Sequence, residues 1–177
     1  MNQAPQVAFI IAAEFEDLEH HVPRMRLIEA GFAVVTAAKE TGAVQGKGGT
    51  RAEATLRTSD LRADDFVAAV VPGGWAPDKV RRDRHALNFL RQMHEQGKIL
   101  GFICHAGWVA ASANLIKPGQ AVTGSLGIRD DLEARGAIWR DEPAFSDGLF
   151  VWGRIVADIP AFNRELTRAL QTSGDRN

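Results

Sequence analysis

The chain has 177 residues, of which 45% are hydrophobic, and its formal net charge at pH 7 is −1. This length suits one domain whose core needs no disulfides, and the balanced charge without a basic stretch argues against a nucleic-acid partner. No apolar stretch reaches the roughly 18 residues of a membrane span, and the N-terminus lacks the basic-then-apolar layout of a signal peptide. We therefore expect a soluble, cytoplasmic protein with no membrane partner, folded as one domain over residues 1–177 with a frayed tail at 172–177.

In the first part of the chain, apolar runs of strand length alternate with helical segments. The run at 7–12 is continuous rather than alternating, which is typical of a strand covered on both faces of a parallel sheet. A helix is expected from the acidic segment 14–19 to Ala30, followed by a strand at 32–37. The glycine-rich stretch 41–50 predicts a hairpin or an edge excursion, because it lacks the Gly-Lys-Ser/Thr ending of a phosphate loop.

The rest of the chain continues this alternation. Apolar residues three and four positions apart predict one helix from Asp78 to Gln96, which Gly97 ends. Strands alternating with helices indicate an α/β fold, a doubly wound three-layer sandwich around a mainly parallel sheet. The other expected elements are strands at 64–71, 98–103, 121–123, 137–140 and 149–153, and helices at 109–116, 129–135 and 158–171.

Cys104 is the only cysteine, and it ends the apolar run 98–103 just before His105, small residues and a helical segment. A strand, a sharp turn and a helix place a side chain above the carboxyl edge of a sheet, beside helix N–H groups that stabilise negative charge. A lone cysteine next to a histidine is a candidate thiolate nucleophile. The alternative is an inert cysteine buried as a small hydrophobic residue.

The acidic segment 14–19 carries four carboxylates where a strand turns into a helix. Most of them are explained by favourable charge at a helix N-terminus. One of them, Glu16 or Glu19, can instead meet the thiol of Cys104, because the carboxyl ends of neighbouring parallel strands converge at such sites. The two glutamates are spaced i, i+3 and can share a helix face, so spacing does not choose between them.

Gly73 and Gly74 follow the expected strand at 64–71. Paired glycines leave backbone N–H groups uncovered and can form half of an oxyanion site, although a plain turn is the simpler interpretation. His85 and His94 are expected on a helix surface. The histidines and Cys104 show no metal-ligand spacing, so neither a metal nor another cofactor is expected.

Motifs along nearly the whole chain occur in the order and spacing of a known family. They are Ala13–Glu19, Val71–Asp78, Gly97–Lys98, Ile103–His105, Ile128–Asp131 and Asp158–Phe162. In these motifs the chain resembles the PfpI family, the intracellular cysteine peptidase branch of the ThiJ/PfpI, or parkinsonism-associated deglycase, superfamily. Several separated motifs in register are strong evidence for fold and weaker evidence for activity.

The resemblance implies a flavodoxin-like sandwich of the class I glutamine amidotransferase type, with Cys104 at the elbow. It implies a protonated glutamate beside the thiol, corresponding best to Glu19, with Glu16 close by. It also implies oxyanion donors from the N–H groups of Gly74 and His105.

The resemblance further implies a site shared between subunits. In peptidase-like members the acidic partner of the histidine comes from a neighbouring chain, and that position matches Asp78. The triad Cys104, His105, Asp78 would then require self-association as a homodimer or hexamer. A third group of this kind makes chemical sense, because it would orient the imidazole.

The chain departs from the family pattern at three places. The family's Cys-His-Gly-Pro reads Cys-His-Ala-Gly at 104–107, Ser125 stands where a tyrosine is common, and the segment between Cys104 and Ile128 is one residue longer. Trp75, in the glycine turn, and Trp108, in the elbow helix, are expected to narrow the substrate pocket near Ser125.

Three functions remain open at this level. The first is an enzyme whose Cys104 thiolate, with a lowered pKa, attacks the carbonyl of a peptide or of a small aldehyde such as methylglyoxal; the absence of a visible specificity pocket favours the small substrate. The second is a stress-response protein that senses oxidation through Cys104 or holds damaged proteins, with little turnover. The third, a glutamine amidotransferase subunit, is disfavoured because no histidine follows His105.

Overall fold

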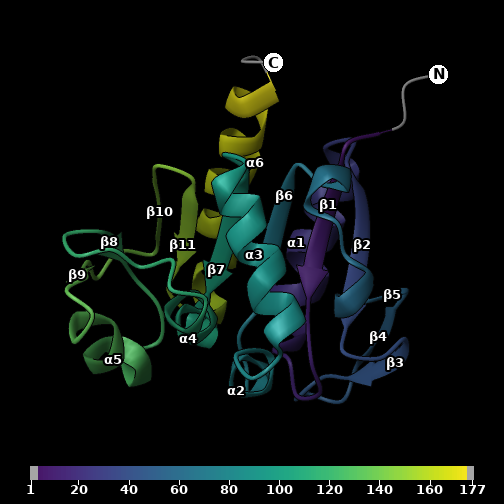
Figure 1. Ribbon diagram of the computed structural model, residues 1–177, viewed down its shortest axis with the longest axis horizontal. Coiled ribbons are helices and arrows are strands. Elements are labelled where there is room, and N and C mark those ends of the chain that lie inside the picture. Colours follow the sequence, from purple (N-terminus) through teal and green to yellow (C-terminus); the bar gives the residue numbers. More distant parts are fainter. Residues whose placement is uncertain (1–3, 175–177) are drawn as a thin grey trace.

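Residues 4–174 are described by a computed structural model. The strands of its central sheet are β1 (Gln6–Ile10), β2 (Ala33–Ala38), β5 (Leu56–Arg57), β6 (Ala68–Val71), β7 (Ile99–Ile103), β10 (Ala144–Asp147) and β11 (Phe150–Gly153). They lie in the order β10-β11-β7-β6-β1-β2-β5 (Figure 1). All neighbours are parallel except β10, which is antiparallel to β11. The expected mainly parallel α/β sheet is thereby confirmed.

Helices cover both faces of this sheet and complete the three layers. They are α1 (Asp17–Glu29), α2 (Ala76–Val80), α3 (Arg84–Glu95), α4 (Gly107–Ser112), α5 (Arg129–Glu133) and α6 (Ile159–Gly174). The view of Figure 1 shows α3 in front of the sheet and α1 and α6 behind it. Accordingly α1 packs against α6, α6 packs against β7, β10 and β11, and α3 packs against β6 and β7.

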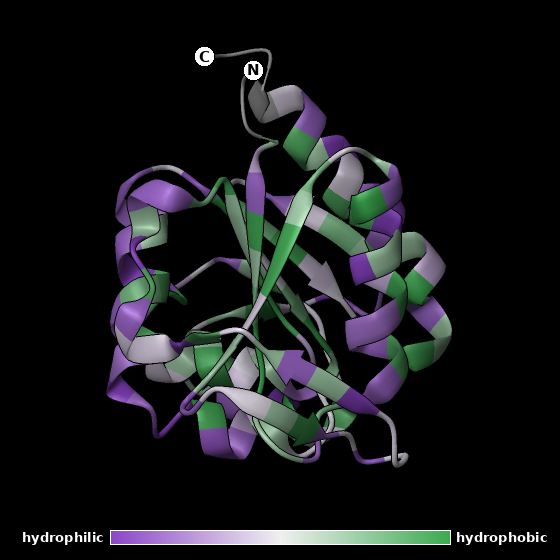
Figure 2. Cartoon of the chain, turned by 90° about the vertical axis from the view of Figure 1, so that its right-hand side faces the viewer, coloured by the Kyte–Doolittle hydropathy of each residue, from purple (hydrophilic) through white to green (hydrophobic). Residues whose placement is uncertain are grey.

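The core lies on both faces of β1, which explains why its sequence is continuously apolar. Val7 and Phe9 join the buried cluster that contains side chains of α1 and α6. Ala8 and Ile10 join the cluster on the α3 side. In Figure 2 the hydrophobic colour is accordingly concentrated on the central strands, and the hydrophilic colour on the outer helices and loops. Burial of each large apolar side chain contributes about 1.5–3 kcal/mol, so this face-to-face packing holds the layers together.

Two small ladders lie outside the central sheet. The glycine-rich stretch forms the expected hairpin, in which β3 (Gly42–Gln45) pairs antiparallel with β4 (Arg51–Ala54). A second ladder pairs β8 (Ala121–Val122) in parallel with β9 (Ile138–Trp139). The edge strands β5 and β10 were not predicted, since β5 has two residues and β10 reads Ala-Phe-Ser-Asp without a strong apolar run.

The predicted single helix 78–96 is wrong, because the chain forms α2 and α3 instead. Asp83 stands between them in an extended conformation, and its carboxylate accepts hydrogen bonds from the N–H groups of His85 at 2.9 Å and Ala86 at 3.4 Å. This is an N-cap, which satisfies donors that a new helix would otherwise leave unpaired. Asp83 therefore starts a second helix where apolar spacing alone suggested continuation.

Other boundaries moved by several residues. The strand expected at 64–71 begins only at Ala68, because a 3-10 turn occupies Ala63–Asp65. The helix expected at 109–116 is the shorter α4, and α6 continues through 172–174, which had been expected to fray. The remainder of that tail, 175–177, lies outside the described residues. No helix within residues 4–174 is long and apolar enough to cross a membrane.

The order of the strands decides where a site can form. The chain passes from β1 to β2 and β5 on one side, and then returns to β6 on the other side of β1. The carboxyl ends of β1, β6 and β7 therefore meet at one edge of the sheet, where ligands bind in open α/β folds. In Figure 1 this is the lower end, which also carries α2, α4 and the β3–β4 hairpin.

Candidate active site

Cys104 lies on a strained turn directly after β7. Its φ is +60°, in the left-handed region, and Cys104–Ala106 form a 3-10 turn that leads into α4. A residue with a side chain costs about 1–2 kcal/mol in this conformation. The surroundings hold it there: the N–H of Ser125 donates to the carbonyl of Cys104 at 3.0 Å, and a Cβ on Gly124 would lie 2.6 Å from the same oxygen. These contacts keep Cys104 in this conformation at the carboxyl edge of the sheet.

Glu19 is the carboxylate that meets this thiol. It projects from α1, is completely buried, and its Oε2 accepts a hydrogen bond of 2.7 Å from the N–H of Gly73. Burial raises the pKa of Glu19 to about 7, the Gly73 N–H opposes the shift, and the charge of Glu16 adds to it. Glu19 also interacts directly with the Cys104 thiol. A carboxyl that holds a proton near neutral pH therefore lies beside the sulfur.

Both glycines after β6 are required by close contacts. A Cβ on Gly73 would lie 2.6 Å from Cys104 Cβ and 2.6 Å from Glu19 Oε2. Gly74 has a φ of +74°, and a Cβ there would lie 2.5 Å from the carbonyl oxygen of Glu14. The N–H of Gly73 is already donated to Glu19, which argues against its expected oxyanion role. The N–H of Gly74, by contrast, is directed at the sulfur of Cys104.

The pKa of the Cys104 thiol differs from the expectation. Burial raises it to about 12, and the negative charge of Glu19 adds to the shift. The N–H groups of Gly74 and His105 lower it, but not enough to offset these effects. The helix that was expected to depress it begins only at Gly107, one 3-10 turn beyond the sulfur, so its dipole contributes little. A thiolate in this site therefore requires Glu19 to be neutral.

The imidazole ring of His105 contacts the sulfur of Cys104. Its Nδ1 is 3.2 Å from Cys104 Sγ, within hydrogen-bonding distance. The ring lies between two indoles, with centroid distances of 5.5 Å to Trp75 and 5.4 Å to Trp108. Burial and the charge of Lys47 lower the pKa of His105, which favours the neutral imidazole.

A pocket of about 520 Å³ opens above the sulfur. One side carries an ion pair of 2.7 Å between Lys47 Nζ and Glu16 Oε2, so Glu16 contacts the pocket rather than the thiol. Trp75, 52% exposed, forms part of the wall. The lining residues are Glu16, Lys47, Gly74, Trp75, Cys104, His105, Ile155, Val156 and Ala157.

Trp108 and Ser125, which were expected to line the pocket, lie outside its lining. Trp108 packs on His105, and its indole N–H donates to Asp131 Oδ2 at 2.7 Å. Ser125 holds the carbonyl of Cys104 through its backbone N–H. Both therefore support the elbow from outside the pocket lining.

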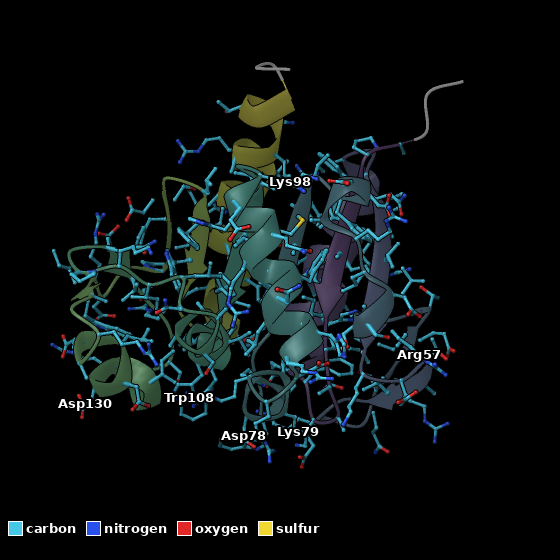
Figure 3. All side chains as sticks on the ribbon, viewed as in Figure 1. Arg57, Asp78, Lys79, Lys98, Trp108 and Asp130 are labelled. Atoms are coloured by element: carbon cyan, nitrogen blue, oxygen red, sulfur yellow. The ribbon has the colours of Figure 1, made fainter. Side chains whose placement is uncertain are left out.

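Asp78 lies on α2 and is directed away from its own chain's site. Its side chain is exposed and forms an ion pair of 2.7 Å with Arg82. Figure 3 shows Asp78 beside Lys79 at the lower rim of the molecule. Among the described residues, Asp78 has no contact with His105, so a role for it in catalysis depends on a neighbouring chain.

Two parts of the pocket were missed by reasoning from sequence. Lys47 is at the tip of the hairpin, where a bridge between Phe15 and Gly46 brings it to the site. Residues 155–157 follow β11, the parallel neighbour of β7, so the rule of converging strand ends would have indicated them. Within residues 4–174 no group of three or more His, Cys, Asp or Glu side chains is arranged to hold a metal ion.

Comparisons with known proteins show the family of this chain. The model of the DJ-1/PfpI family matches residues 5–169. The chain is 37% identical over 166 residues to Deglycase PfpI of Pyrococcus furiosus, covering 94% of this chain and 99% of that protein. It is 35% identical over 167 residues to YraA of Bacillus subtilis, whose name assigns it only provisionally to the cysteine proteases; the match covers 94% and 98% of the two chains.

A solved structure gives the same result. A two-domain protein of Anabaena variabilis, with DJ-1/ThiJ/PfpI-like and ferritin-like domains, superposes with a TM-score of 0.89 at 34% identity. The match covers 96% of this chain, which spans about half (48%) of that longer protein. The chain belongs to the DJ-1/PfpI family.

Proposed function

We propose that this protein is an enzyme in which the sulfur of Cys104 attacks the carbonyl carbon of small aldehydes, with glyoxalase- or deglycase-like activity. One observation carries the proposal: the thiol of Cys104 lies in the lining of one pocket with the backbone N–H groups of Gly74 and His105, and the protonatable Glu19 is buried directly beside the thiol. The name of the Pyrococcus furiosus relative, a deglycase, supports the deglycase-like part of this proposal.

The proposed first step transfers one proton and changes no oxidation state. Between pH about 7 and about 12, Cys104 and Glu19 together hold one proton, because two negative charges at this distance repel each other. The attacking form has this proton on Glu19 and the charge on sulfur. As the S–C bond forms, the C=O π electrons move to oxygen, which takes the proton from Glu19 to give a hemithioacetal. For methylglyoxal, transfer of the C1 hydrogen to C2 as a proton then converts the hemithioacetal into a thioester. Water adds to the thioester carbonyl and the S–C bond breaks, which releases lactate, returns one proton to the Cys104–Glu19 pair and gives one proton to solvent.

The size of the pocket favours small substrates. Its volume of about 520 Å³ is bounded by the Lys47–Glu16 ion pair on one side and by residues 155–157 on another. A long peptide would need an extended groove, whereas a two- or three-carbon aldehyde fits within these walls. Peptidase activity is therefore the secondary enzymatic proposal, supported by the name of the Bacillus subtilis relative.

The test is consumption of methylglyoxal by the native chain and by Cys104→Ser. Loss of consumption in the variant, with an unchanged far-ultraviolet circular dichroism spectrum, is the expected result. A fluorogenic peptide assayed with the same two proteins tests the peptidase proposal separately. Equal aldehyde consumption by both proteins would rule out Cys104 as the nucleophile.

The alternative function is oxidation sensing through Cys104, coupled to a stress response. The observation that favours it is Glu19 Oε1, which is buried with no nitrogen or oxygen partner among the described residues and can hydrogen-bond an oxidised sulfur. Mild peroxide followed by intact-mass measurement tests it. Addition of two oxygens that is absent in Cys104→Ser supports sensing, and an unchanged mass contradicts it.

A further inference from the structure

Two adjacent histidines of α1 have no part in the proposed reaction, yet they form a continuous hydrogen-bonded chain. His20 Nε2 lies 3.1 Å from Thr36 Oγ1 on β2. His20 Nδ1 lies 3.3 Å from Nδ1 of His21. His21 Nε2 in turn lies 2.9 Å from Oγ1 of Thr50, which directly precedes β4. The chain thus leads from a buried strand to the loop beside the pocket.

Asp17 ends this chain. Its buried carboxylate accepts the hydroxyl proton of Thr50, the N–H of Thr50 at 2.8 Å and the N–H of Gly48 at 2.5 Å. Burial alone would raise the pKa of Asp17, but the Thr50 hydroxyl and the two N–H groups outweigh burial, so its pKa is lowered. Asp17 is therefore ionised at neutral pH and can only accept hydrogen bonds.

An ionised Asp17 dictates the direction of every bond in the chain. The single hydroxyl proton of Thr50 goes to Asp17, so Thr50 Oγ1 must accept from an N–H at His21 Nε2. A neutral His21 then has a bare Nδ1, which must accept from an N–H at His20 Nδ1. His20 Nε2 is therefore bare and accepts the hydroxyl proton of Thr36. With both rings neutral, no other placement of the protons satisfies all four bonds.

Neutrality of His20 follows from its surroundings. It is buried between the rings of Phe9 and Phe15, at centroid distances of 5.3 Å and 5.2 Å. Burial lowers its pKa to about 3, and the charge that His21 carries when protonated and the charge of Arg24 act in the same direction.

The loop held by this chain carries Lys47 into the pocket. Lys47 N–H donates to the carbonyl of Phe15 at 2.8 Å, and its Nζ pairs with Glu16. The charge of Lys47 lowers the pKa of Glu19 and of His105, and it interacts favourably with a negative Cys104. Displacement of the loop would therefore change the charge balance around the sulfur.

We propose that His20 and His21 are positioning residues. Together with Asp17 they form a hydrogen-bond chain in which each bond has one fixed donor, and this chain holds the 46–50 loop and its Lys47 at the Cys104 pocket. This inference rests on the proposed function in one respect: the position of Lys47 matters because Cys104 is the proposed nucleophile. Neither histidine touches the reacting atoms.

The tautomers provide the first test, and it needs no variant and no substrate. Long-range ¹H–¹⁵N correlation spectra of the native protein at pH 8 distinguish a protonated Nδ1 from a protonated Nε2. We expect the proton on Nε2 of His21 and on Nδ1 of His20. The opposite tautomer at either ring would overturn the directional chain.

The second test reads the charge at the sulfur. The rate at which iodoacetamide alkylates Cys104 is followed from pH 6 to 10 in folded Thr50→Val, which keeps the N–H to Asp17 and loses only the hydroxyl, and in His21→Leu. We expect both profiles to move to higher pH by about 0.5 unit, because a displaced Lys47 no longer stabilises the negative sulfur. Thr50→Ser should restore the native profile, and His85→Leu, at an exposed position of α3, should not change it.

The outcomes separate this inference from the proposed function. Native profiles in both Thr50→Val and His21→Leu would overturn the positioning role. Shifted profiles in the two variants, together with a native protein that consumes no aldehyde, would retain the positioning role and reject the proposed activity, since alkylation reports on the sulfur and not on turnover.

Discussion

Glu19 Oε2 and the backbone N–H of Gly73 are joined by a hydrogen bond of 2.7 Å, although 54 positions separate the two residues. This bond ties α1 to the turn after β6 at the point where Cys104 approaches both. The carboxyl of Glu19 is thereby held next to the sulfur.

Gly73→Ala is expected to displace the reactive groups. The new Cβ would lie 2.6 Å from Cys104 Cβ and from Glu19 Oε2, which real Cβ atoms do not tolerate. We expect a loss of about 1–3 kcal/mol in unfolding free energy from overpacking, and about 100-fold in aldehyde turnover from misplacement. Urea unfolding and initial rates measure the two effects.

The matched control is Gly127→Ala. A Cβ there has its nearest contact at 3.6 Å, to His105 Nε2, and the backbone is not in the left-handed region. Its unfolding free energy should stay within about 0.5 kcal/mol of the native value. If Gly73→Ala behaves like this control, the packing of the glycine turn has been misjudged.

Glu19→Gln should change how stability depends on pH. The folded-state pKa of about 7 lies above the ordinary value of 4.5, so between these values the folded state holds a proton that the unfolded state has lost. Native stability therefore falls as pH rises through this window, by about 3 kcal/mol in total. A neutral amide removes this loss, so the variant should match the native protein near pH 4 and exceed it at pH 8.

The same variant separates charge from proton transfer. Removing the charge of Glu19 should lower the pKa of Cys104 and speed its alkylation at pH 8. Aldehyde turnover should nevertheless fall about 100-fold or more, because the amide cannot supply a proton. Slower alkylation together with retained turnover would contradict the role given to Glu19.

His20→Leu should make the protein more resistant to acid. The pKa of His20 is about 3 in the folded state against an ordinary 6.5, so below pH 6.5 the unfolded state gains a proton that the folded state cannot bind. Native stability is therefore lost as pH falls from 6.5 towards 3. Between pH 7 and pH 4 the variant should lose about 3 kcal/mol less than the native protein.

Chemical unfolding at pH 4, 5, 6 and 7 measures this difference. His85→Leu is the matched control, because His85 is exposed and its substitution should leave the pH dependence unchanged. Parallel stability curves for native protein and His20→Leu would show that the buried imidazole does not control acid unfolding.

Asp78 is predicted to act on a neighbouring chain's His105, as an exposed carboxylate on the rim beside Lys79 (Figure 3). When each variant is assayed alone, Cys104→Ser and Asp78→Ala should both be inactive. Unfolded together and refolded as a dimer, they should recover about a quarter of native activity, because half of the dimers are mixed and each has one complete site. No recovery, with mixed dimers shown by native mass spectrometry, would place the orienting group within one chain.

From the sequence alone, the central strands and the elbow were predictable because their signals are local. A continuous apolar run such as 7–12 indicates a strand buried on both faces, and Cys104 followed by His105 and small residues indicates a turn that exposes a thiol. The motifs that resemble the PfpI family also lie within short segments. Each of these inferences needs only neighbouring residues.

Spacing left Glu16 and Glu19 open and the resemblance favoured Glu19, but only the tertiary structure brings one of them into contact with the thiol. The rotation of α1 about its axis follows from packing against the sheet and α6, which buries Glu19 beside Cys104 and directs Glu16 to Lys47. The same packing buries the sulfur, so its pKa rises where sequence reasoning expected a fall. Desolvation and charge coupling depend on distances between segments remote in the chain, which periodicity and local spacing do not contain.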